Sequence, residues 1–529
     1  MGQGPPGPPG RLRLPLVPSA TMAVHPGSGP ATVTRSWTAP AMLALALTAA
    51  ACGSGPPGAQ APPTSAAVTA VAPPPPIAWT ACPTRPTVEC GSVPVPLDYD
   101  HPESRSLTIA VTRIPAVTGH ALDGTLVMNP GGPGESGNQI LPIEYPLLPA
   151  QVRDRMDVVG FDPRGTGASS PLRCGTELAA VTSALPVPSR PGDELPGTPV
   201  FAGIPTACST AAPELIRTVD TVATARDMDR IRQALGLPRV SYYGLSYGTV
   251  LGTVYASLFP HRVAAMVLDG AVDQFAPLSV QATEQAPAAE RSLVHLLASC
   301  ATGPSCPLGA DPTAFFTRLS ASIAARPLPA PGNGDLTPVT LGDLDTATLF
   351  AISVPGFTPL YYSALVAAIH GDGSGLRSLA LEFVVDVGGA PLVDAQWAIT
   401  CNDTTHHLGP RAAGTLARAL SARSPMIGGF TVNYNLGGCV TWWDSRRPVS
   451  SMHPDDAPPV LVIGNTGDPN TPLIGARHLA SAYPHATQLT WVGWGHTWLL
   501  SGSTDSCVQA AVTRYLASGH LPPPAMVCH

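Results

Sequence analysis

One serine of this chain has neighbours that could make it a nucleophile. The segment Gly244-Leu-Ser246-Tyr-Gly248 contains the only Gly-x-Ser-x-Gly pattern of the sequence. The pattern alone is weak evidence, because the chain has 52 glycines and an ordinary tight turn could contain the same residues. However, residues 240–243 read as a strand and residues 249–258 as a helix. A sharp turn between a strand and a helix exposes a serine hydroxyl for nucleophilic attack, and we therefore predict that Ser246 is catalytic.

A serine hydroxyl needs a histidine base that is itself oriented by a carboxylate, and the sequence offers both partners downstream. The strand-like run 460–464 leads into Asp468, and the strand-like run 489–492 leads into a Gly-flanked His496. The chain order serine, acid, histidine is the one that this kind of catalytic triad follows. A turn-forming aspartate and a surface-loop histidine are the alternative interpretations of these two residues.

Acyl transfer by such a triad also needs two backbone N–H groups that stabilise the oxyanion. The residue after the nucleophile, Tyr247, would supply one of them. The second is expected from the Gly-rich segment 129–137, which follows the strand-like run 125–128 and includes Gly132. A mobile linker is the other interpretation of this glycine-rich segment, but its position directly after a strand argues against a linker.

Alternating strand-like and helix-like segments must position these residues. Residues 107–111 alternate like an antiparallel strand, whereas 125–129, 156–161 and 265–269 are short apolar runs typical of buried parallel strands. From residue 274 to about 429 the apolar spacing is mainly helical, before strand-like runs resume. We therefore predict an α/β protein with a mostly parallel central sheet and an inserted helical cap. The expected core segments are 79–275 and 430–529, with the cap at 276–429.

The N-terminal region reads as an export signal followed by a tether. Residues 1–40 contain arginine but no acidic residue, and 41–51 form a short apolar run that ends in alanines. This pattern predicts a signal peptide over 1–51, and Met22 is a possible alternative start. Cys52 then begins Cys-Gly-Ser-Gly, as the lipid-modified cysteine of a lipoprotein would, although Ala49 stands where leucine is usual. The protein is thus expected to be a cell-envelope lipoprotein or a secreted protein, with a flexible Pro/Ala-rich tether at 52–78.

The cysteine content also favours export. Apart from Cys52, ten of the 11 cysteines remain, and scattered cysteines in an exported chain normally form disulfides. Sequence alone does not fix their connectivity. Several of them are close neighbours along the chain, namely Cys82/Cys90, Cys174/Cys208, Cys300/Cys306, Cys401/Cys439 and Cys507/Cys528.

The composition excludes several classes of chemistry. The sequence contains no lysine, which rules out Schiff-base catalysis, a Ser–Lys dyad and a P-loop lysine. Only 12% of the residues are charged, the net charge is -7 and no arginine cluster exists, so a nucleic-acid partner is not expected. His406 and His407 lie near Cys401 and are of metal-ligating types, but adjacent side chains diverge and Cys401 is expected in a disulfide. Neither a metal nor an organic cofactor is expected.

Taken together, these motifs resemble a known family. Asn129-Pro-Gly-Gly-Pro-Gly, Gly160-Phe-Asp-Pro-Arg-Gly-Thr-Gly, Gly244-Leu-Ser-Tyr-Gly, Asp468-Pro-Asn-Thr-Pro and Gly495-His-Thr occur in this order. They are similar to motifs of the actinomycete tripeptidyl aminopeptidases and proline iminopeptidases and of exported mycobacterial carboxylesterase/proteases. The resemblance spans about residues 79–528, includes a TAP-like C-terminal part, and implies an α/β-hydrolase fold. It also implies cleavage of short N-terminal peptides or of esters outside the cell.

The choice between peptide and ester depends on recognition of a free amine. An aminopeptidase must bind an α-ammonium group, which is costly to desolvate unless a carboxylate meets it. We expect this acid to be Glu135, just beyond Gly132, or Asp403, where the cap returns to the core. Either acid could instead be solvated or structurally paired. A carboxylesterase, an endopeptidase or a catalytically silent ligand-binding lipoprotein would need neither, and membrane contact is expected only through a lipid on Cys52.

Overall fold

The computed structural model describes residues 72–529 except 304, 332–336 and 386–390. The predicted signal peptide, most of the tether, Met22 and Cys52 lie outside the described residues. The described part belongs to one compact unit, residues 70–529. The sheet and the helices above it can therefore be treated as a single body.

A ten-stranded sheet runs through this unit in the order β1-β2-β3-β5-β4-β6-β7-β8-β9-β10. β1 to β3 and the β3–β5 pair are antiparallel, whereas all pairs from β5 across to β10 are parallel. The predicted mostly parallel sheet is thus confirmed. Its strands are β1 (Thr80–Cys82), β2 (Arg85–Pro96), β3 (Ser106–Ile114), β4 (Thr125–Asn129), β5 (Asp157–Phe161), β6 (Val240–Leu245), β7 (Val263–Asp269), β8 (Val460–Gly467), β9 (Ala486–Trp494) and β10 (Val527–Cys528).

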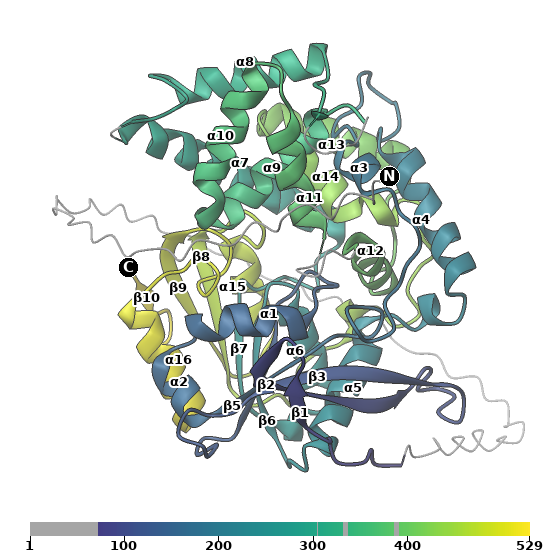
Figure 1. Cartoon of the computed structure of the whole chain (residues 1–529), viewed down its shortest axis with the longest axis vertical. Coiled ribbons are helices and arrows are strands. Elements are labelled where there is room, and N and C mark those ends of the chain that lie inside the picture. The colour runs from purple at the N-terminus through teal and green to yellow at the C-terminus, as the bar shows by residue number, and fades with distance from the viewer. Residues whose placement is uncertain (1–71, 304, 332–336, 386–390) are drawn as a thin grey trace, which may run out of the picture. The chain divides into compact units, whose positions relative to one another are not determined.

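Helices cover both faces of the sheet and one of its ends (Figure 1). They are α1 (Gly137–Glu144), α2 (Ala150–Arg155), α3 (Leu178–Thr182), α4 (Thr198–Ala211), α5 (Thr221–Ala234), α6 (Gly248–Leu258), α7 (Leu278–Thr302), α8 (Pro312–Ala325), α9 (Leu341–Ser353), α10 (Thr358–Ile369), α11 (Ser374–Val384), α12 (Val393–Asn402), α13 (Pro410–Arg423), α14 (Phe430–Leu436), α15 (Leu473–Ser481) and α16 (Ser506–Ser518).

The central strands are apolar throughout because both of their faces are buried. Tyr242 and Leu268 face a core that they share with α5, α6 and α15. Their neighbours Tyr243 and Val267 face a second core, shared with α1, α2 and α16. Successive side chains of one strand therefore contribute to two different cores, which explains why these segments read as continuous apolar runs in the sequence.

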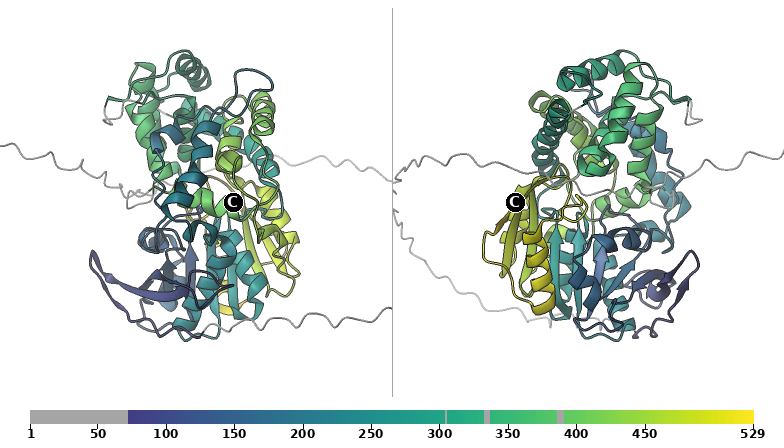
Figure 2. Two further views of the ribbon diagram at one scale, coloured as in Figure 1. Left: turned by 90° about the vertical axis from the view of Figure 1, so that its right-hand side faces the viewer. Right: turned by 60° about the vertical axis from the view of Figure 1, so that its left-hand side comes forward.

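Helices α7 to α14 lie beyond the carboxyl ends of the parallel strands (Figures 1 and 2). α7 to α11 share a separate apolar core that includes Leu293, Phe316 and Leu344, and Phe430 of α14 joins it. α3 and α4, which come before the nucleophile, contact this layer through α9, α11 and α12, while buried side chains of α4 also join the core that the sheet shares with α5 and α6. α14 packs on α7 and α13, so the chain returns to the sheet only at β8. We propose that the cap contains residues 178–211 in addition to 276–429.

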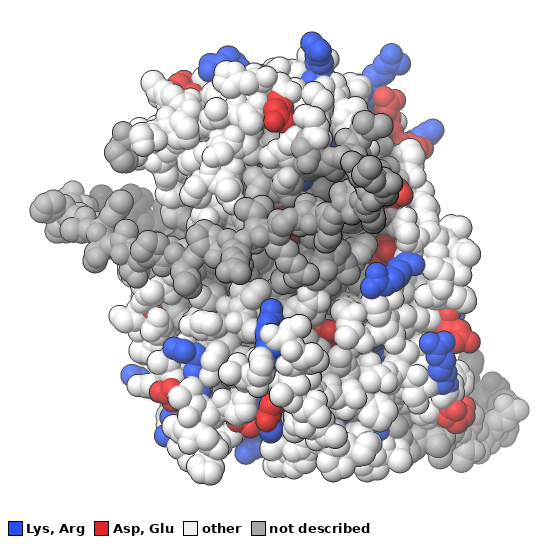
Figure 3. Space-filling view, viewed as in Figure 1, with Lys and Arg blue, Asp and Glu red and all other residues white. Residues whose placement is uncertain are grey.

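No single helix among the described residues is both long and apolar enough to cross a bilayer. One pair, α9 with Pro355–Ile369, meets the criteria of length and composition together but is bent by 119°. The surface shown in Figure 3 carries scattered charged side chains of both signs.

All ten cysteines within residues 72–529 are paired with their sequence neighbours. The disulfides are Cys82–Cys90, Cys174–Cys208, Cys300–Cys306, Cys401–Cys439 and Cys507–Cys528. The structure thus selects neighbour pairing among the connectivities that the sequence left open.

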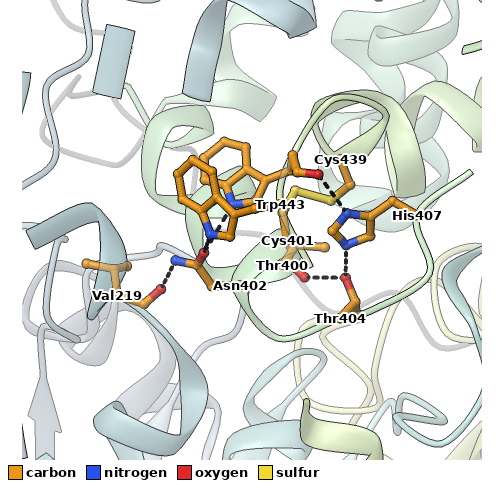
Figure 4. Close-up of a disulfide and its surroundings, with 9 residues drawn as sticks. Val219, Thr400, Cys401, Asn402, Thr404, His407, Cys439 and Trp443 are labelled. Atoms are coloured by element: carbon orange, nitrogen blue, oxygen red, sulfur yellow. Dashed lines mark hydrogen bonds between the residues drawn. A yellow bond between two sulfur atoms is a disulfide. The ribbon is translucent and has the colours of Figure 1, made fainter. Parts of the chain in front are cut away.

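The Cys401–Cys439 bond joins the end of α12 to the segment after α14 (Figure 4). Beside it, the Asn402 side chain accepts hydrogen bonds from the indole N–H groups of Trp442 and Trp443, at 3.0 and 2.9 Å. His407 lies against Thr404 and the carbonyl oxygen of Trp442, and Cys401 is held in the disulfide. This disulfide therefore secures the junction at which the cap returns to the sheet.

Removal of a disulfide should destabilise the protein more when the bond closes a longer loop. Cys401–Cys439 spans 38 residues and Cys300–Cys306 spans 6. In the chain-entropy model, losing the longer loop costs about 4 kcal/mol of unfolding free energy and losing the shorter one about 2 kcal/mol. The double variants Cys401→Ser/Cys439→Ser and Cys300→Ser/Cys306→Ser, unfolded in urea without reductant, measure both values. Equal losses would contradict the expectation, and unreduced mass spectrometry should find no more than one free thiol.

Candidate active site

Ser246 lies on a strained turn between β6 and α6. Its φ of 54° is in the left-handed region that a residue with a side chain rarely adopts. The turn is held by hydrogen bonds from Ser246 N–H to the Asp269 carbonyl oxygen at 2.9 Å and from Thr249 N–H to the Ser246 carbonyl oxygen at 2.9 Å. The side chain therefore projects from the end of a buried strand on a backbone that its neighbours fix.

The two glycines of the motif allow this turn to close. A Cβ atom on Gly244 would lie 2.3 Å from the carbonyl oxygen of Gly248, and one on Gly248 would lie 2.7 Å from that of Asn129. Both contacts are with backbone, which cannot give way as a flexible side chain would. The Gly-x-Ser-x-Gly spacing thus follows from close packing among β6, α6 and the end of β4.

Asp468 and His496 meet at the carboxyl ends of β8 and β9. The Nδ1 atom of His496 lies 3.0 Å from each carboxylate oxygen of Asp468. The carboxylate also accepts hydrogen bonds from the N–H groups of Asn470, Thr471 and Thr497, at 2.8, 2.8 and 3.0 Å. The backbone N–H of His496 donates a hydrogen bond to the carbonyl oxygen of Ser353 in the cap, at 2.8 Å. With Nδ1–H donating to the carboxylate, Nε2 of the ring is left as the basic atom.

Burial and pairing act in opposite directions on these two groups. Burial raises the pKa of Asp468, but the nearby His496 and the backbone N–H donors outweigh it and hold the pKa below its ordinary value. Burial likewise lowers the pKa of His496, and the Asp468 carboxylate outweighs this and raises it. Asp468 is therefore ionised at neutral pH and stabilises a protonated His496.

Two backbone N–H groups beside Ser246 are candidates for an oxyanion site. Gly132 and Tyr247 line a cavity together with Ser246, and within the described part of the chain neither N–H donates a hydrogen bond. Gly131 and Gly132 have φ values of 111° and 100°, which favour glycine. A Cβ atom on Gly131 would lie 2.7 Å from the Leu245 carbonyl oxygen, so this loop packs directly against the nucleophile turn.

The Asp162 carboxylate fixes the loop that contains Gly132. It accepts hydrogen bonds from the Ser136 hydroxyl at 2.5 Å, from Asn138 N–H at 3.0 Å and from Ala168 N–H at 2.7 Å. Burial raises the pKa of Asp162, while these hydrogen bonds oppose the shift. The Phe-Asp-Pro-Arg-Gly-Thr-Gly motif thus holds the start of α1 and, through it, the glycine-rich loop.

A cavity of about 180 Å³ lies between Ser246 and the cap. Glu135 and His496 line it as well, and Glu135 is only partly exposed. Burial raises the pKa of Glu135 to about 7, although the charge of His496 opposes this shift. Among the described residues the Glu135 carboxylate has no hydrogen-bond partner. Most of the wall is apolar and includes the rings of Phe201, Phe350, Phe383, Trp397, Phe430 and Tyr434.

Asp403 has a different environment. Its carboxylate accepts hydrogen bonds from both the N–H and the hydroxyl of Thr221, at 2.8 and 2.5 Å, and the same hydroxyl contacts Tyr247. Burial and the nearby Asp220 raise its pKa well above the ordinary value. Although Asp403 lines a second cavity beside Ser246, its oxygens already hold the first turn of α5. Of the two acids expected to meet an amine, only Glu135 has an uncommitted carboxylate.

Three contributors to this site escaped sequence reasoning. Asp269 accepts hydrogen bonds through its carboxylate from the N–H groups of Trp498 and Leu499, and burial raises its pKa to about 6. Thr471 donates its hydroxyl to Asp468 at 2.9 Å. The backbone carbonyl oxygen of Ser353, in the cap, accepts a hydrogen bond from the backbone N–H of His496. Asp269 could have been noticed as an acid at a strand end, and Thr471 belongs to the Asp468-Pro-Asn-Thr-Pro motif, whereas Ser353 carries no distinguishing pattern.

Comparison with protein families gives two matches along the chain. A family model described as "alpha/beta hydrolase fold" matches residues 124–343. A second, described as "TAP-like protein", matches residues 424–528. The first includes Ser246 and the second includes both Asp468 and His496.

Several curated proteins are similar over most of their length. Serine protease Hip1 of Mycobacterium tuberculosis is 33% identical, over 86% of this chain and 91% of the relative. Carboxylesterase B of the same species is 31% identical over 84% and 86%. The tripeptidyl aminopeptidase of Streptomyces lividans is 29% identical over 82% of both chains. Among solved structures, the proline iminopeptidase of Mycobacterium smegmatis matches with a TM-score of 0.40 and 16% identity, over 80% of this chain and 97% of that one.

Replacement of Ser246 tests the nucleophile. Ser246→Ala should lower kcat on a p-nitrophenyl ester by about 10⁴-fold or more, because no covalent intermediate can form. Ser257→Ala, on the helix that follows, is the matched control, since its hydroxyl bonds only the Thr253 carbonyl oxygen. A fluorophosphonate probe should label wild type at Ser246. Unchanged turnover in Ser246→Ala, or no adduct on wild type, would favour the ligand-binding lipoprotein instead.

The pH dependence tests the role of His496. The base must be neutral to accept a proton, so activity should rise as pH increases through its pKa. Because Asp468 raises this pKa, the acid limb of kcat/KM on a neutral ester should have its midpoint above 6.5, the ordinary histidine value. Asp468→Asn should move the midpoint to lower pH and reduce kcat. A midpoint well below 6.5 in wild type would contradict this assignment.

Proposed function

This chain belongs to the TAP-like family of α/β-hydrolases and is a serine hydrolase, and we propose that it is an exported aminopeptidase that releases short N-terminal peptides. The relatives include proteins named as a serine protease, a tripeptidyl aminopeptidase and a carboxylesterase, so family membership alone leaves the substrate open. The observation that carries the proposal is the uncommitted Glu135 carboxylate in the cavity shared by Ser246 and His496. Five disulfides support export.

The proposed reaction proceeds through an acyl-enzyme. His496 Nε2 takes the proton of the Ser246 hydroxyl as its oxygen attacks the substrate carbonyl carbon. The N–H groups of Gly132 and Tyr247 stabilise the oxyanion, and Asp468 stabilises the imidazolium. His496 then returns the proton to the leaving amine or alcohol as the carbonyl–heteroatom bond breaks. Water, activated by the same histidine, hydrolyses the ester of Ser246 and releases the acid.

Glu135 fits an α-ammonium group for electrostatic reasons. A carboxylate that is buried without a hydrogen-bond partner is destabilised in the free enzyme, and burial already raises the pKa of Glu135 to about 7. A cation placed beside it would favour the ionised form and restore the interactions lost on burial. The surrounding aromatic wall would exclude water and strengthen this contact. The acyl side of the substrate would thus bind in the Glu135 cavity.

A carboxylesterase remains the second candidate, favoured by the largely apolar wall of the same cavity. Such an enzyme gains nothing from a buried carboxylate beside its acyl group. The two candidates therefore differ in their response to a positive charge on the substrate. They agree on the nucleophile and on the base.

Acetylation of the substrate amine distinguishes the candidates. N-acetylation of a tripeptide p-nitroanilide should lower kcat/KM at least about tenfold, equivalent to about 1.4 kcal/mol of transition-state binding. Glu135→Gln should remove most of this difference, because the amide cannot pair with an ammonium. Measuring both substrates on both enzymes gives the coupling directly.

Two further measurements complete this test. Glu382→Gln removes an exposed acid from the wall of the same cavity and should leave the discrimination largely in place. A short-chain ester reports whether each variant still folds and turns over. If wild type cleaves the free and the N-acetylated peptide at equal rates, the aminopeptidase proposal is wrong, and a carboxylesterase or an endopeptidase is left. Loss of discrimination only in Glu382→Gln would move the amine site to that residue.

A further inference from the structure

A second cavity, of about 140 Å³, also reaches Ser246 and is lined by Gly132 and Tyr247, the two residues of the candidate oxyanion site. Ser246 and Gly132 line both cavities, whereas Glu135 and His496 line only the first and Tyr247 only the second. The N-terminal half of α7 and the segment after β7 form one wall of the second cavity. A substrate attacked by Ser246 can therefore extend in two directions, and the chemistry of the two cavities differs.

Two glutamine side chains in this wall are held in fixed orientations. The amide nitrogen of Gln274 donates to the carbonyl oxygens of Val449 and Met452, at 3.0 and 3.3 Å. The amide nitrogen of Gln281 donates to those of Asp273 and Ala276, at 3.1 and 3.0 Å. Because each amide is oriented by its two donor contacts, the opposite atom of each group must be the acceptor oxygen.

The two acceptor oxygens differ in access. Gln274 is only 4% exposed, and its oxygen is fully buried without a hydrogen-bond partner among the described residues. Gln281 is partly exposed and lines the second cavity. Its oxygen is therefore the one that can accept a hydrogen bond from a ligand bound there.

Two carboxylates line the same cavity in addition to Asp403, whose oxygens are hydrogen bonded to Thr221. Asp273 accepts a hydrogen bond from Phe275 N–H at 3.1 Å and lies 3.1 Å from a ring nitrogen of His478, while Glu284 has no hydrogen-bond partner among the described residues. Burial raises the pKa of Glu284, and the Asp273 carboxylate adds to the shift whereas His478 opposes it. No arginine or histidine occurs among the described residues that line this cavity. The wall thus offers acceptors and negative charge but no cationic side chain.

We propose that the second cavity binds the leaving part of the substrate and selects a cationic group there, such as a guanidinium, a primary ammonium or a quaternary ammonium. A cation would lie beside Glu284 and relieve its repulsion with Asp273, and where the cation carries an N–H group, that donor would bond the Gln281 oxygen. The assignment of the leaving part to the second cavity rests on the proposed function, because an α-ammonium group bound at Glu135 places the acyl part of the substrate in the first cavity. For a peptide, the selected residue is an arginine or lysine directly after the cleaved bond.

Esters test this assignment without relying on peptide cleavage. Butyrylcholine and its uncharged isostere, 3,3-dimethylbutyl butyrate, share an acyl group and differ only in the charge of the leaving alcohol. Wild type should show a kcat/KM ratio of at least about fivefold in favour of the choline ester. Glu284→Gln should reduce this ratio to below about twofold, since the isosteric amide keeps an acceptor but loses the charge.

A matched variant on the same helix controls for changes in the cap. Glu290→Gln removes an equal charge from α7, at a residue that caps the N–H groups of Met426 and Ile427 and does not line the cavity. It should keep the wild-type ratio. A wild-type ratio near one, or equal loss of the ratio in both variants, would overturn the proposal.

A peptide pair extends the test to the proposed substrates. Peptides that carry arginine or its uncharged isostere citrulline after the cleaved bond, with the cut located by mass spectrometry, should show the same preference and the same loss in Glu284→Gln. If no peptide is cleaved, the aminopeptidase proposal fails while the ester ratio still reports on the cavity. A preference that followed cationic acyl groups instead of leaving groups would reverse the assignment and overturn it.

Discussion

The carboxylate of Asp269 accepts hydrogen bonds from the loop that follows His496, while its backbone oxygen accepts one from Ser246. Asp269 ends β7, between the strand of the nucleophile and the strand that leads to Asp468. Asp269 is fully buried and links the turn after β6, which contains Ser246, and the loop after β9, which contains His496, to the end of β7. The relative positions of these segments decide whether a proton can pass from serine to histidine. The parallel register of β6, β7 and β8 brings these loops to one edge, and Asp269 holds them there.

The sequence was informative wherever both faces of a strand are buried. The predicted central strands and the predicted helix that follows Ser246 all occur in the structure, because short apolar runs ended by Gly or Pro leave few alternatives. β2 was not predicted, since its 12 residues contain three prolines and a glycine that read as turns. The position of Asp468 and His496 at strand ends followed from the same reasoning, because carboxyl ends of parallel strands share one edge of a sheet.

Tertiary contacts between distant segments could not be read from sequence. α3 and α4 precede the nucleophile by many residues yet pack with the cap, because they contact α9, α11 and α12. The environments of Glu135 and Asp403 were equally hidden. Both are acids near the cleft, but only the position of Thr221 decides that one is hydrogen bonded and the other is free. Local patterns find elements, whereas partners of buried polar groups come from packing.

Sheet and cap contribute different properties to this hydrolase. The sheet fixes Ser246, Asp468 and His496 through backbone contacts that do not depend on the substrate. The cap supplies most of the wall of the first cavity, whereas core and cap residues together line the second, and these walls differ in kind: aromatic rings with one buried acid in the first, oriented acceptor oxygens with acidic groups in the second. Under the two proposals made above, acids on both sides of the nucleophile would favour substrates with a cation at either end of the cleaved bond. Changes in the cap can therefore alter substrate choice while the chemistry at Ser246 stays the same.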